Sequence, residues 1–149
     1  MENLFDREVY NTIINRIESL TPNSAAKWGK MNVSQMLAHC AVAFGVPLSD
    51  KKLKGNFLMR LIGPLFKKQL YDDTPWKQNL PTAPNFKIAD ERNFETEKQK
   101  LISLVNRFFS AGQDGISKFP HPIFGHFTPQ QWGQSMYKHL DHHLRQFGG

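Results

Sequence analysis

Apolar residues recur along four long stretches of the chain at the three- and four-residue steps of an α-helix. The stretches span about residues 4–20, 32–46, 90–111 and 128–147. Side chains at these steps lie on one face of a helix, which is then buried against other elements. No stretch shows the alternation and turn residues of a β-hairpin. The pattern therefore predicts an all-α protein, a four-helix bundle formed by a single domain over residues 1–149.

The ends of these stretches carry residues that begin or stop helices. Asn32 with Gln35, and Thr128 with Gln131, have the spacing of a capping box, in which each partner binds the other's backbone N–H. Acidic residues gather at the start of the third stretch, where the helix dipole favours them. Gly112 is the expected C-terminal stop of that helix.

Two connections, residues 72–89 and 112–127, are longer than ordinary loops. Both contain prolines, but their large apolar side chains argue against disorder. These side chains are Trp76, Phe86, Phe119, Ile123, Phe124 and Phe127. We expect these long aromatic loops to fold back over the bundle and to roof a pocket.

The composition is that of a folded protein from a reducing compartment. Of the 149 residues, 40% are hydrophobic and 21% are charged, which is enough apolar surface for one core. The lone cysteine, Cys40, excludes an internal disulfide. No apolar run reaches the roughly 20 residues of a membrane span, and the N-terminus lacks the apolar stretch of a signal peptide. We therefore expect a cytoplasmic protein.

The excess positive charge lies in one place. Lys and Arg number 19 against 13 Asp and Glu, and six of the basic residues fall in residues 51–68, a stretch without an acid. They are Lys51, Lys52, Lys54, Arg60, Lys67 and Lys68. The rest of the chain is neutral, and we expect no nucleic-acid partner, because such proteins often spread basic residues over a whole face.

Apolar residues interleave with these charges at helical spacing, among them Leu58, Leu61 and Leu65. One interpretation is a basic amphipathic segment that touches an anionic surface or partner. The commoner arrangement, which we favour, is a short extra helix packed on the body with its lysines in solvent. Gly63–Pro64 is expected to interrupt a continuous helix there. The three leucines also suggest the face of a homodimer.

Three of the six histidines lie in the last stretch. His139 and His143 are four residues apart, so both imidazoles project from one face of the helix, a familiar arrangement for two ligands of one metal ion. They share the apolar stripe, whereas His142 falls toward the polar side. His39, at the border of the second stripe, is the candidate third ligand. The alternatives are a surface pair that complements the helix dipole, and a core histidine at position 39.

Four other residues have two interpretations each. Cys40 is expected to be a small buried side chain rather than a ligand or nucleophile. His121 and His126 lie in the second aromatic loop, where either residue could line the mouth of the pocket or form a hydrogen bond to a ligand histidine. For His121, which has a proline on each side, the alternative is a structural role in a turn. Gln146 is either a surface residue or a hydrogen-bond partner of a ligand histidine.

Three blocks of sequence resemble a known family. They are WGKM at 28–31 with VSQMLAHC at 33–40, HPIFG at 121–125 with the TP and QWG that follow, and YKHLDHHLRQFG at 137–148. In these blocks the chain resembles a bacterial branch of unknown function within the DinB-like (DinB/YfiT-like) metalloenzyme superfamily.

The resemblance implies a four-helix bundle with up–down–down–up topology. It also implies a divalent metal ion held by one histidine of the second helix and a His-x-x-x-His pair of the last helix. By position in this chain, those ligands are His39, His139 and His143. Zn is the first choice of metal, and Ni, Fe or Mn also accept imidazole ligands.

A metal ion held by three neutral imidazoles keeps its full charge and lowers the pKa of a water or thiol that it binds. Characterised members of the superfamily that this chain resembles include enzymes that transfer or isomerise substrates with a low-molecular-weight thiol. The first expectation is therefore a transferase or isomerase that uses a thiol such as bacillithiol or glutathione on a small-molecule substrate. The alternatives are a metal-dependent hydrolase and a non-catalytic metal- or small-molecule-binding bundle. Hydrolysis is the weaker alternative, because Asp141, the only acid of the last helix, is expected to point outward and pair with Arg145.

Overall fold

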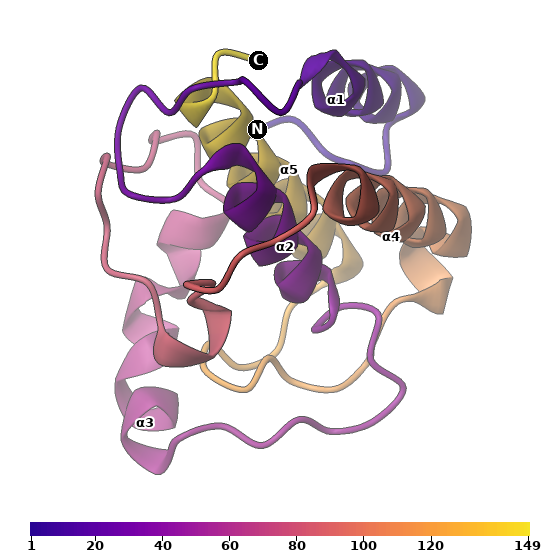
Figure 1. The fold of residues 1–149 in the computed structure, drawn as a ribbon. Helices are drawn as coiled ribbons and strands as arrows, with labels where there is room; N and C mark the ends of the chain where they lie inside the picture. Colours follow the sequence, from indigo (N-terminus) through magenta and orange to yellow (C-terminus); the bar gives the residue numbers. More distant parts are fainter.

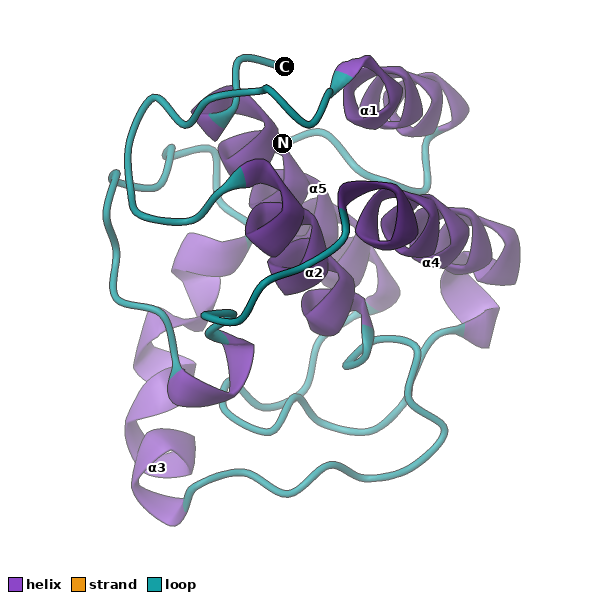
Figure 2. Ribbon diagram, in the orientation of Figure 1, coloured by secondary structure: helices purple, strands orange, loops and turns teal.

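Five α-helices and two short 3-10 helices make up the protein, with no β-strand (Figures 1 and 2). The structure, a computed structural model, describes all 149 residues. The elements are α1 (Arg7–Ser19), α2 (Val33–Phe44), α3 (Phe57–Phe66), η1 (Lys67–Leu70), η2 (Pro84–Phe86), α4 (Phe94–Gly115) and α5 (Pro129–Gln146). α1, α2, α4 and α5 match the four predicted stretches, so the all-α prediction is confirmed. None of the helices combines the length and the apolar content needed to cross a lipid bilayer.

The four long helices enclose one core. α2 packs on both α4 and α5, and α1 also contacts α4 and α5. In Figure 1, α2 lies in front of α5, and α3 projects away from the other helices. The largest fully buried side chains come from all four long helices: Ile13, Ile17, Met36, Leu37, Phe44, Leu101, Val105, Phe108, Leu140 and Leu144. Their packing holds α2 beside α5, the two helices that carry the candidate metal ligands.

Both predicted capping boxes are present. At the start of α2, the Gln35 backbone N–H donates to Asn32 Oδ1 at 2.9 Å, and the Asn32 N–H donates to Gln35 Oε1 at 3.0 Å. Thr128 and Gln131 form the same reciprocal pair at the start of α5. These local bonds set where each of the two helices begins, and so set the register of the histidines along them.

α4 begins later than the sequence predicted. It starts at Phe94 rather than near residue 90, because the Asn93 side chain caps it by accepting the Thr96 N–H at 2.9 Å. Gly112 has a left-handed φ of 64° and interrupts the regular helix, as expected from the sequence.

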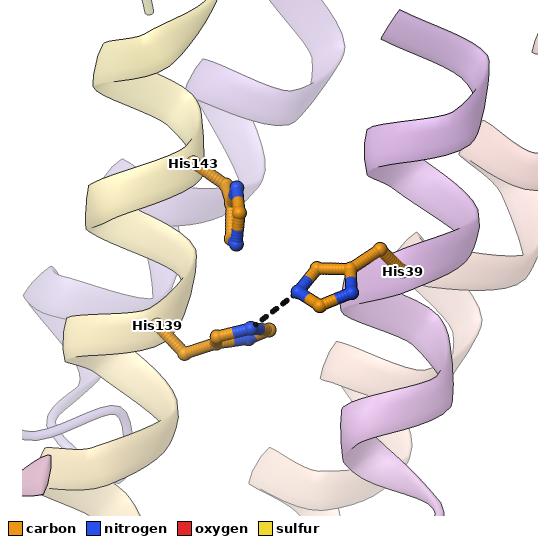
Figure 3. A group of neighbouring side chains, drawn as sticks. All are labelled: His39, His139 and His143. Carbon is orange, nitrogen blue, oxygen red and sulfur yellow. Dashed lines mark hydrogen bonds between the residues drawn. The ribbon is translucent and has the colours of Figure 1, made fainter. Parts of the chain in front are cut away.

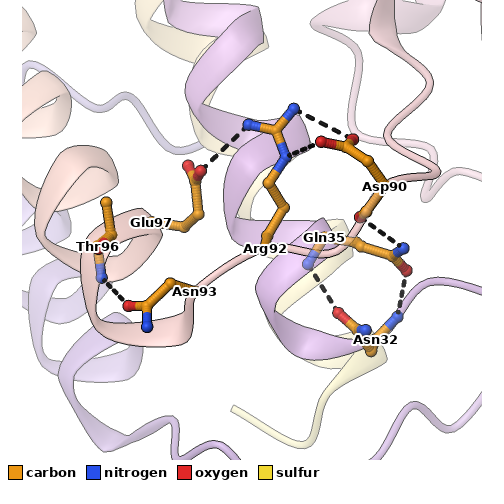
Figure 4. Close-up of polar contacts among 7 residues, drawn as sticks. All are labelled: Asn32, Gln35, Asp90, Arg92, Asn93, Thr96 and Glu97. Atoms are coloured by element: carbon orange, nitrogen blue, oxygen red, sulfur yellow. Dashed lines mark hydrogen bonds and ion pairs between the residues drawn. The ribbon is translucent and has the colours of Figure 1, made fainter.

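The connection between η1 and α4 folds back over α2, as predicted. Gln35 Nε2 donates to the Asp90 carbonyl at 3.2 Å (Figure 4). Arg92 joins Asp90, at 3.0 Å from Nε to Oδ2, to the buried Glu97 of α4, at 3.2 Å from Nη1 to Oε1. These contacts fix the connection across α2 one helical turn from His39.

α3 departs from two expectations drawn from the sequence, an interruption of the helix and the packing of its apolar side chains on the body. The interruption predicted at Gly63–Pro64 does not occur, since α3 continues through both residues and ends at Phe66. The prediction that its apolar side chains pack on the body is also wrong, since Phe57 and Leu65 are 75% and 79% exposed. Gly63 is the buried residue of this helix, and its backbone lies so close to the Ile123 carbonyl that a side chain would not fit.

Candidate metal centre

Three histidines from two helices meet between α2 and α5. His39 projects from the middle of α2, and His139 and His143 lie one turn apart on the facing side of α5 (Figure 3). One nitrogen of each ring lies within 4.8 Å of one nitrogen of the other two. The structure therefore brings together the three side chains that the spacing and the resemblance single out, in an arrangement suited to a tridentate metal site.

A backbone carbonyl sets the orientation of the His39 ring. His39 Nδ1 lies 2.8 Å from the Phe86 carbonyl oxygen. Because a carbonyl oxygen only accepts hydrogen bonds, Nδ1 carries the proton and donates it. The other ring nitrogen, Nε2, then presents a lone pair to the space between α2 and α5, which is the form of a metal-ligating imidazole.

A side-chain amide has the same effect on His143. Its Nδ1 lies 2.9 Å from Gln146 Oε1. The orientation of the amide is determined at its other end, where Gln146 Nε2 donates to the Trp28 carbonyl at 2.7 Å. Gln146 therefore accepts the His143 Nδ1–H, and His143 Nε2 is left with its lone pair. Of the two roles considered for Gln146, the structure shows that of a hydrogen-bond partner, here of the clustered His143.

Gly29 leaves room for the Gln146 amide beside the Trp28 carbonyl. It has a left-handed φ of 82°, and a Cβ at this position would lie 2.7 Å from Gln146 Nε2. Any other residue would be strained and would also displace the Gln146 amide. The sequence reasoning missed Gly29, although its place after Trp28 in the WGKM block was visible.

His139 is held differently from the other two. Its Nε2 lies 3.0 Å from His39 Nε2, and its buried Nδ1 has no hydrogen-bond partner. Because His39 Nε2 presents a lone pair, His139 Nε2 either carries a proton and donates it to His39, or presents a second lone pair, which would repel the first unless a cation lies between them. A cation held by the three histidines would satisfy this requirement, so the donor set fits a divalent metal ion.

Burial keeps all three histidines neutral. It lowers the pKa of His39, lowers that of His139 well below its usual value, and lowers that of His143 to about 3. The neighbouring imidazoles add to this effect at His139 and His143, because a second positive charge nearby is unfavourable. Neutral imidazole is the protonation state that ligates metal ions.

The sequence predicted that His142 lies on the polar side of α5. In the structure this residue is buried and only 8% exposed. Its ring packs against the rings of Trp28 and Trp76, with centroids 5.7 and 5.6 Å away. The prediction failed because the connection after η1 covers this side of α5. Lys138 anchors that connection, since its Nζ donates to the Gln69 carbonyl at 2.7 Å and lies 2.7 Å from Asp72 Oδ1.

No carboxylate or thiol joins the three histidines. Asp141 forms the predicted ion pair with Arg145 at 2.8 Å, but it is also held by Arg16 of α1 at 2.9 Å. Cys40 is fully buried, as expected, and burial raises the pKa of its thiol. The candidate metal centre is thus lined by imidazoles and aromatic rings, including Trp76, whose ring centroid is 5.9 Å from that of His139.

The two loop histidines lie away from this centre. His121 has the turn role, because its Nδ1 accepts the backbone N–H groups of Ile123 and Phe124 at 3.0 and 3.2 Å. His121 and His126 also line a cavity of about 350 Å³, together with residues of the basic stretch before and within α3. None of the three clustered histidines lines that cavity.

Comparison with known proteins identifies a family. The model of DUF1569, described as a protein of unknown function, matches residues 4–148. No curated protein and no solved structure matches the chain. The match spans nearly the whole chain, including every residue of the histidine cluster. The chain therefore belongs to the DUF1569 family of proteins of unknown function.

Proposed function

We propose that this protein is a DinB-like metalloprotein that binds one divalent metal ion through His39, His139 and His143, and uses it in a thiol-dependent transferase or isomerase reaction on a small molecule. The observation that carries the proposal is the approach of three buried, neutral imidazoles within 4.8 Å. The Nδ1–H contacts of His39 and His143 support it, because they leave the Nε2 lone pairs free to bind the same ion.

Three imidazole ligands leave coordination positions open for a substrate or cofactor. A bound divalent ion would supply charge that lowers the pKa of a thiol and holds it as the nucleophilic thiolate. The chain's own residues would orient the ligands and exclude water. Phe86 and Trp76 lie against His39 and His139, so they would limit solvent access and strengthen electrostatic interactions inside the site. Zn is the metal we expect first, with Ni, Fe or Mn as alternatives.

The absence of a free acid favours thiol chemistry over hydrolysis. A hydrolase commonly needs a general base beside the attacking water, whereas a thiol already ionised by a metal needs none. Asp141 is engaged by Arg16 and Arg145, and Asp72 by Lys138. A metal-dependent hydrolase is therefore the second proposal, and a bundle that binds a metal or a small molecule without catalysis is the third.

Metal content is the first test. Protein purified without a histidine tag should contain close to one metal ion per chain by elemental mass spectrometry, or take one up on addition of Zn or Ni. The His139→Ala variant should lose it. His126→Ala is the matched control, because it removes an exposed histidine outside the cluster, and it should keep the metal. A wild-type protein that binds no metal would overturn the proposal.

The thiol is tested separately. Protein loaded with Co²⁺ should gain a thiolate-to-metal absorption band when bacillithiol or glutathione is added, and should show no such change with serine in place of the thiol. Metal-dependent ester or amide cleavage without a thiol, and without the absorption band, would instead favour the hydrolase. Metal binding with neither response would favour the non-catalytic bundle.

A further inference from the structure

We infer that α3 and its basic flanks form a docking surface for an anionic phospholipid bilayer. This surface, called the α3 surface below, comprises residues 51–68. The inference is independent of the metal centre, which lies between α2 and α5. It rests on three observations: an unpartnered apolar helix, an acid-free basic stretch around it, and a cation-lined cavity at its base.

The helix presents apolar side chains to solvent on almost every side. The most exposed are Phe57 at 75%, Leu58 at 63%, Leu61 at 61%, Leu65 at 79% and Phe66 at 51%. Contiguous apolar exposure of this kind is rare on a soluble protein and marks an interaction site. Figure 1 shows α3 projecting from the bundle, so its outer side is free to approach a flat surface.

The attachment of α3 to the body decides which side faces outward. The backbone of Gly63 lies against the Ile123 carbonyl. At about 100° per residue, Leu61 and Leu65 both lie roughly 200° from Gly63 around the helix, on the far side. Their side chains therefore point away from the protein, which is the geometry of a helix that inserts its outer face among lipid headgroups.

The charge of the surrounding stretch selects an anionic partner. No acid occurs in residues 51–68, and Lys51, Lys52, Lys54 and Arg60 are exposed. Lys67 is less available, because its Nζ binds the His126 carbonyl and lies 4.8 Å from the centroid of the Phe127 ring. Basic clusters beside an apolar helix are typical of surfaces that bind acidic lipids.

The cavity at the base of α3 extends this surface inward. It has a volume of about 350 Å³ and is lined by Lys52 and Arg60, with Leu53 and Ile123 beside them. Arg60 is three residues before Gly63, so it lies about 60° from the side of α3 that meets the body. The two cations are placed to bind a lipid phosphate while the leucines on the opposite side of the helix contact the acyl region.

Two other partners fit the surface less well. In a homodimer through α3, the cations of both copies would be brought together with no acid to offset them. A nucleic acid would satisfy the cations but would leave Leu61 and Leu65 against a polar backbone. An anionic bilayer satisfies both the charge and the apolar face, so it is the partner that the surface fits best.

The test is co-sedimentation of the full-length protein with vesicles. Binding is expected to vesicles that contain phosphatidylglycerol, to be absent with pure phosphatidylcholine, and to weaken as salt is raised. Each basic residue near an acidic leaflet changes partitioning by about fivefold, so losing the attraction of three of them should weaken binding about a hundredfold, and reversing their charge should weaken it by at least that much. Lys51→Glu/Lys52→Glu/Lys54→Glu should show this loss. Lys87→Glu/Lys100→Glu/Lys118→Glu, with the same net charge and exposed lysines elsewhere, should bind within severalfold of wild type.

The apolar contribution is tested with Leu58→Ser/Leu61→Ser/Leu65→Ser, which should also lose binding without loss of helix content, because these side chains are exposed. Leu80→Ser, at a site 49% exposed on another loop, is the matched control. Equal loss in both lysine variants would mean attraction by net charge alone and would overturn the inference. An absence of vesicle binding by the wild-type protein would also overturn the inference. The same holds if the wild-type protein binds no vesicles but forms a dimer in light scattering that the leucine variant abolishes. None of these outcomes depends on metal at the histidine cluster, so the two proposals fail separately.

Discussion

Replacing Gln146 by leucine removes the contact that holds the tautomer of His143. The Gln146 side chain is 3% exposed, accepts the Nδ1–H of His143 at 2.9 Å and donates to the Trp28 carbonyl at 2.7 Å. Leucine has a similar volume but forms neither bond. The His143 Nδ1–H would then be buried without a partner, the part-buried Trp28 carbonyl would lose its donor, and His143 would be free to carry its proton on Nε2 instead.

Two magnitudes follow from this geometry. Loss of a hydrogen-bond partner behind a ligating histidine typically weakens metal affinity by about 10- to 100-fold, which we expect for Gln146→Leu. Each buried polar group left unpaired costs about 1–3 kcal/mol, so the metal-free protein should also lose stability. Gln146→Glu separates the two effects. Its carboxylate still accepts the His143 Nδ1–H, but cannot donate to the Trp28 carbonyl, so stability should fall while metal affinity stays close to that of wild type.

The assay pairs a Zn competition titration with urea unfolding in the presence of a chelator. Gln130→Leu, an exposed position on the same helix, is the control and should change neither quantity. An unchanged Zn affinity in Gln146→Leu, on protein whose free energy of unfolding has fallen as expected, would refute the argument. Gln146 would then support the fold alone and would have no part in setting the His143 tautomer.

Three further outcomes are expected. Gly29→Ala should reproduce the Gln146→Leu loss of Zn affinity, because a Cβ there lies 2.7 Å from Gln146 Nε2; normal affinity in the titration would count against the contact. Burial lowers the pKa of His121 from 6.5 to about 4. As the pH falls from 6.5 to 4, this histidine therefore binds a proton in the unfolded chain but not in the folded one. The free energy of unfolding should fall over this range, with a contribution from His121 of up to about 3 kcal/mol. His121→Asn, whose carbonyl can accept the same N–H groups, should remove that share of the acid sensitivity in urea titrations at several pH values; an unchanged slope would contradict the assignment. Lys138→Met should lower the free energy of unfolding by about 1–3 kcal/mol, because the part-buried Gln69 and Asp72 carbonyls lose their donor. Wild-type stability of this variant in urea unfolding would disprove the role of Lys138.

Features of the chain that depend on near neighbours were visible in its sequence. The capping boxes at Asn32 and Thr128 need only a partner three residues away, and both form as predicted. The spacing of His139 and His143 places them on one face of any helix, so this half of the candidate metal centre was visible before the fold was known. The apolar stripes likewise predicted which sides of the long helices are buried.

Features that depend on distant segments were decided only by the tertiary structure. His39 reaches His139 across 100 residues of sequence, and the Phe86 carbonyl that orients it is 47 residues away. Helical periodicity contains no information about which helices pack together or where a loop crosses them. For the same reason the polar side predicted for His142 proved to be buried under a loop.

α3 shows the same limit in the opposite direction. Its apolar residues, read as a sequence, indicate a helix packed on the body, yet Leu65 is 79% exposed. The helix meets the body through the backbone of Gly63, a contact that no apolar pattern encodes. Periodicity specifies which side of a helix is apolar, but whether the protein itself or an outside partner covers that side depends on the space that the rest of the fold leaves around it.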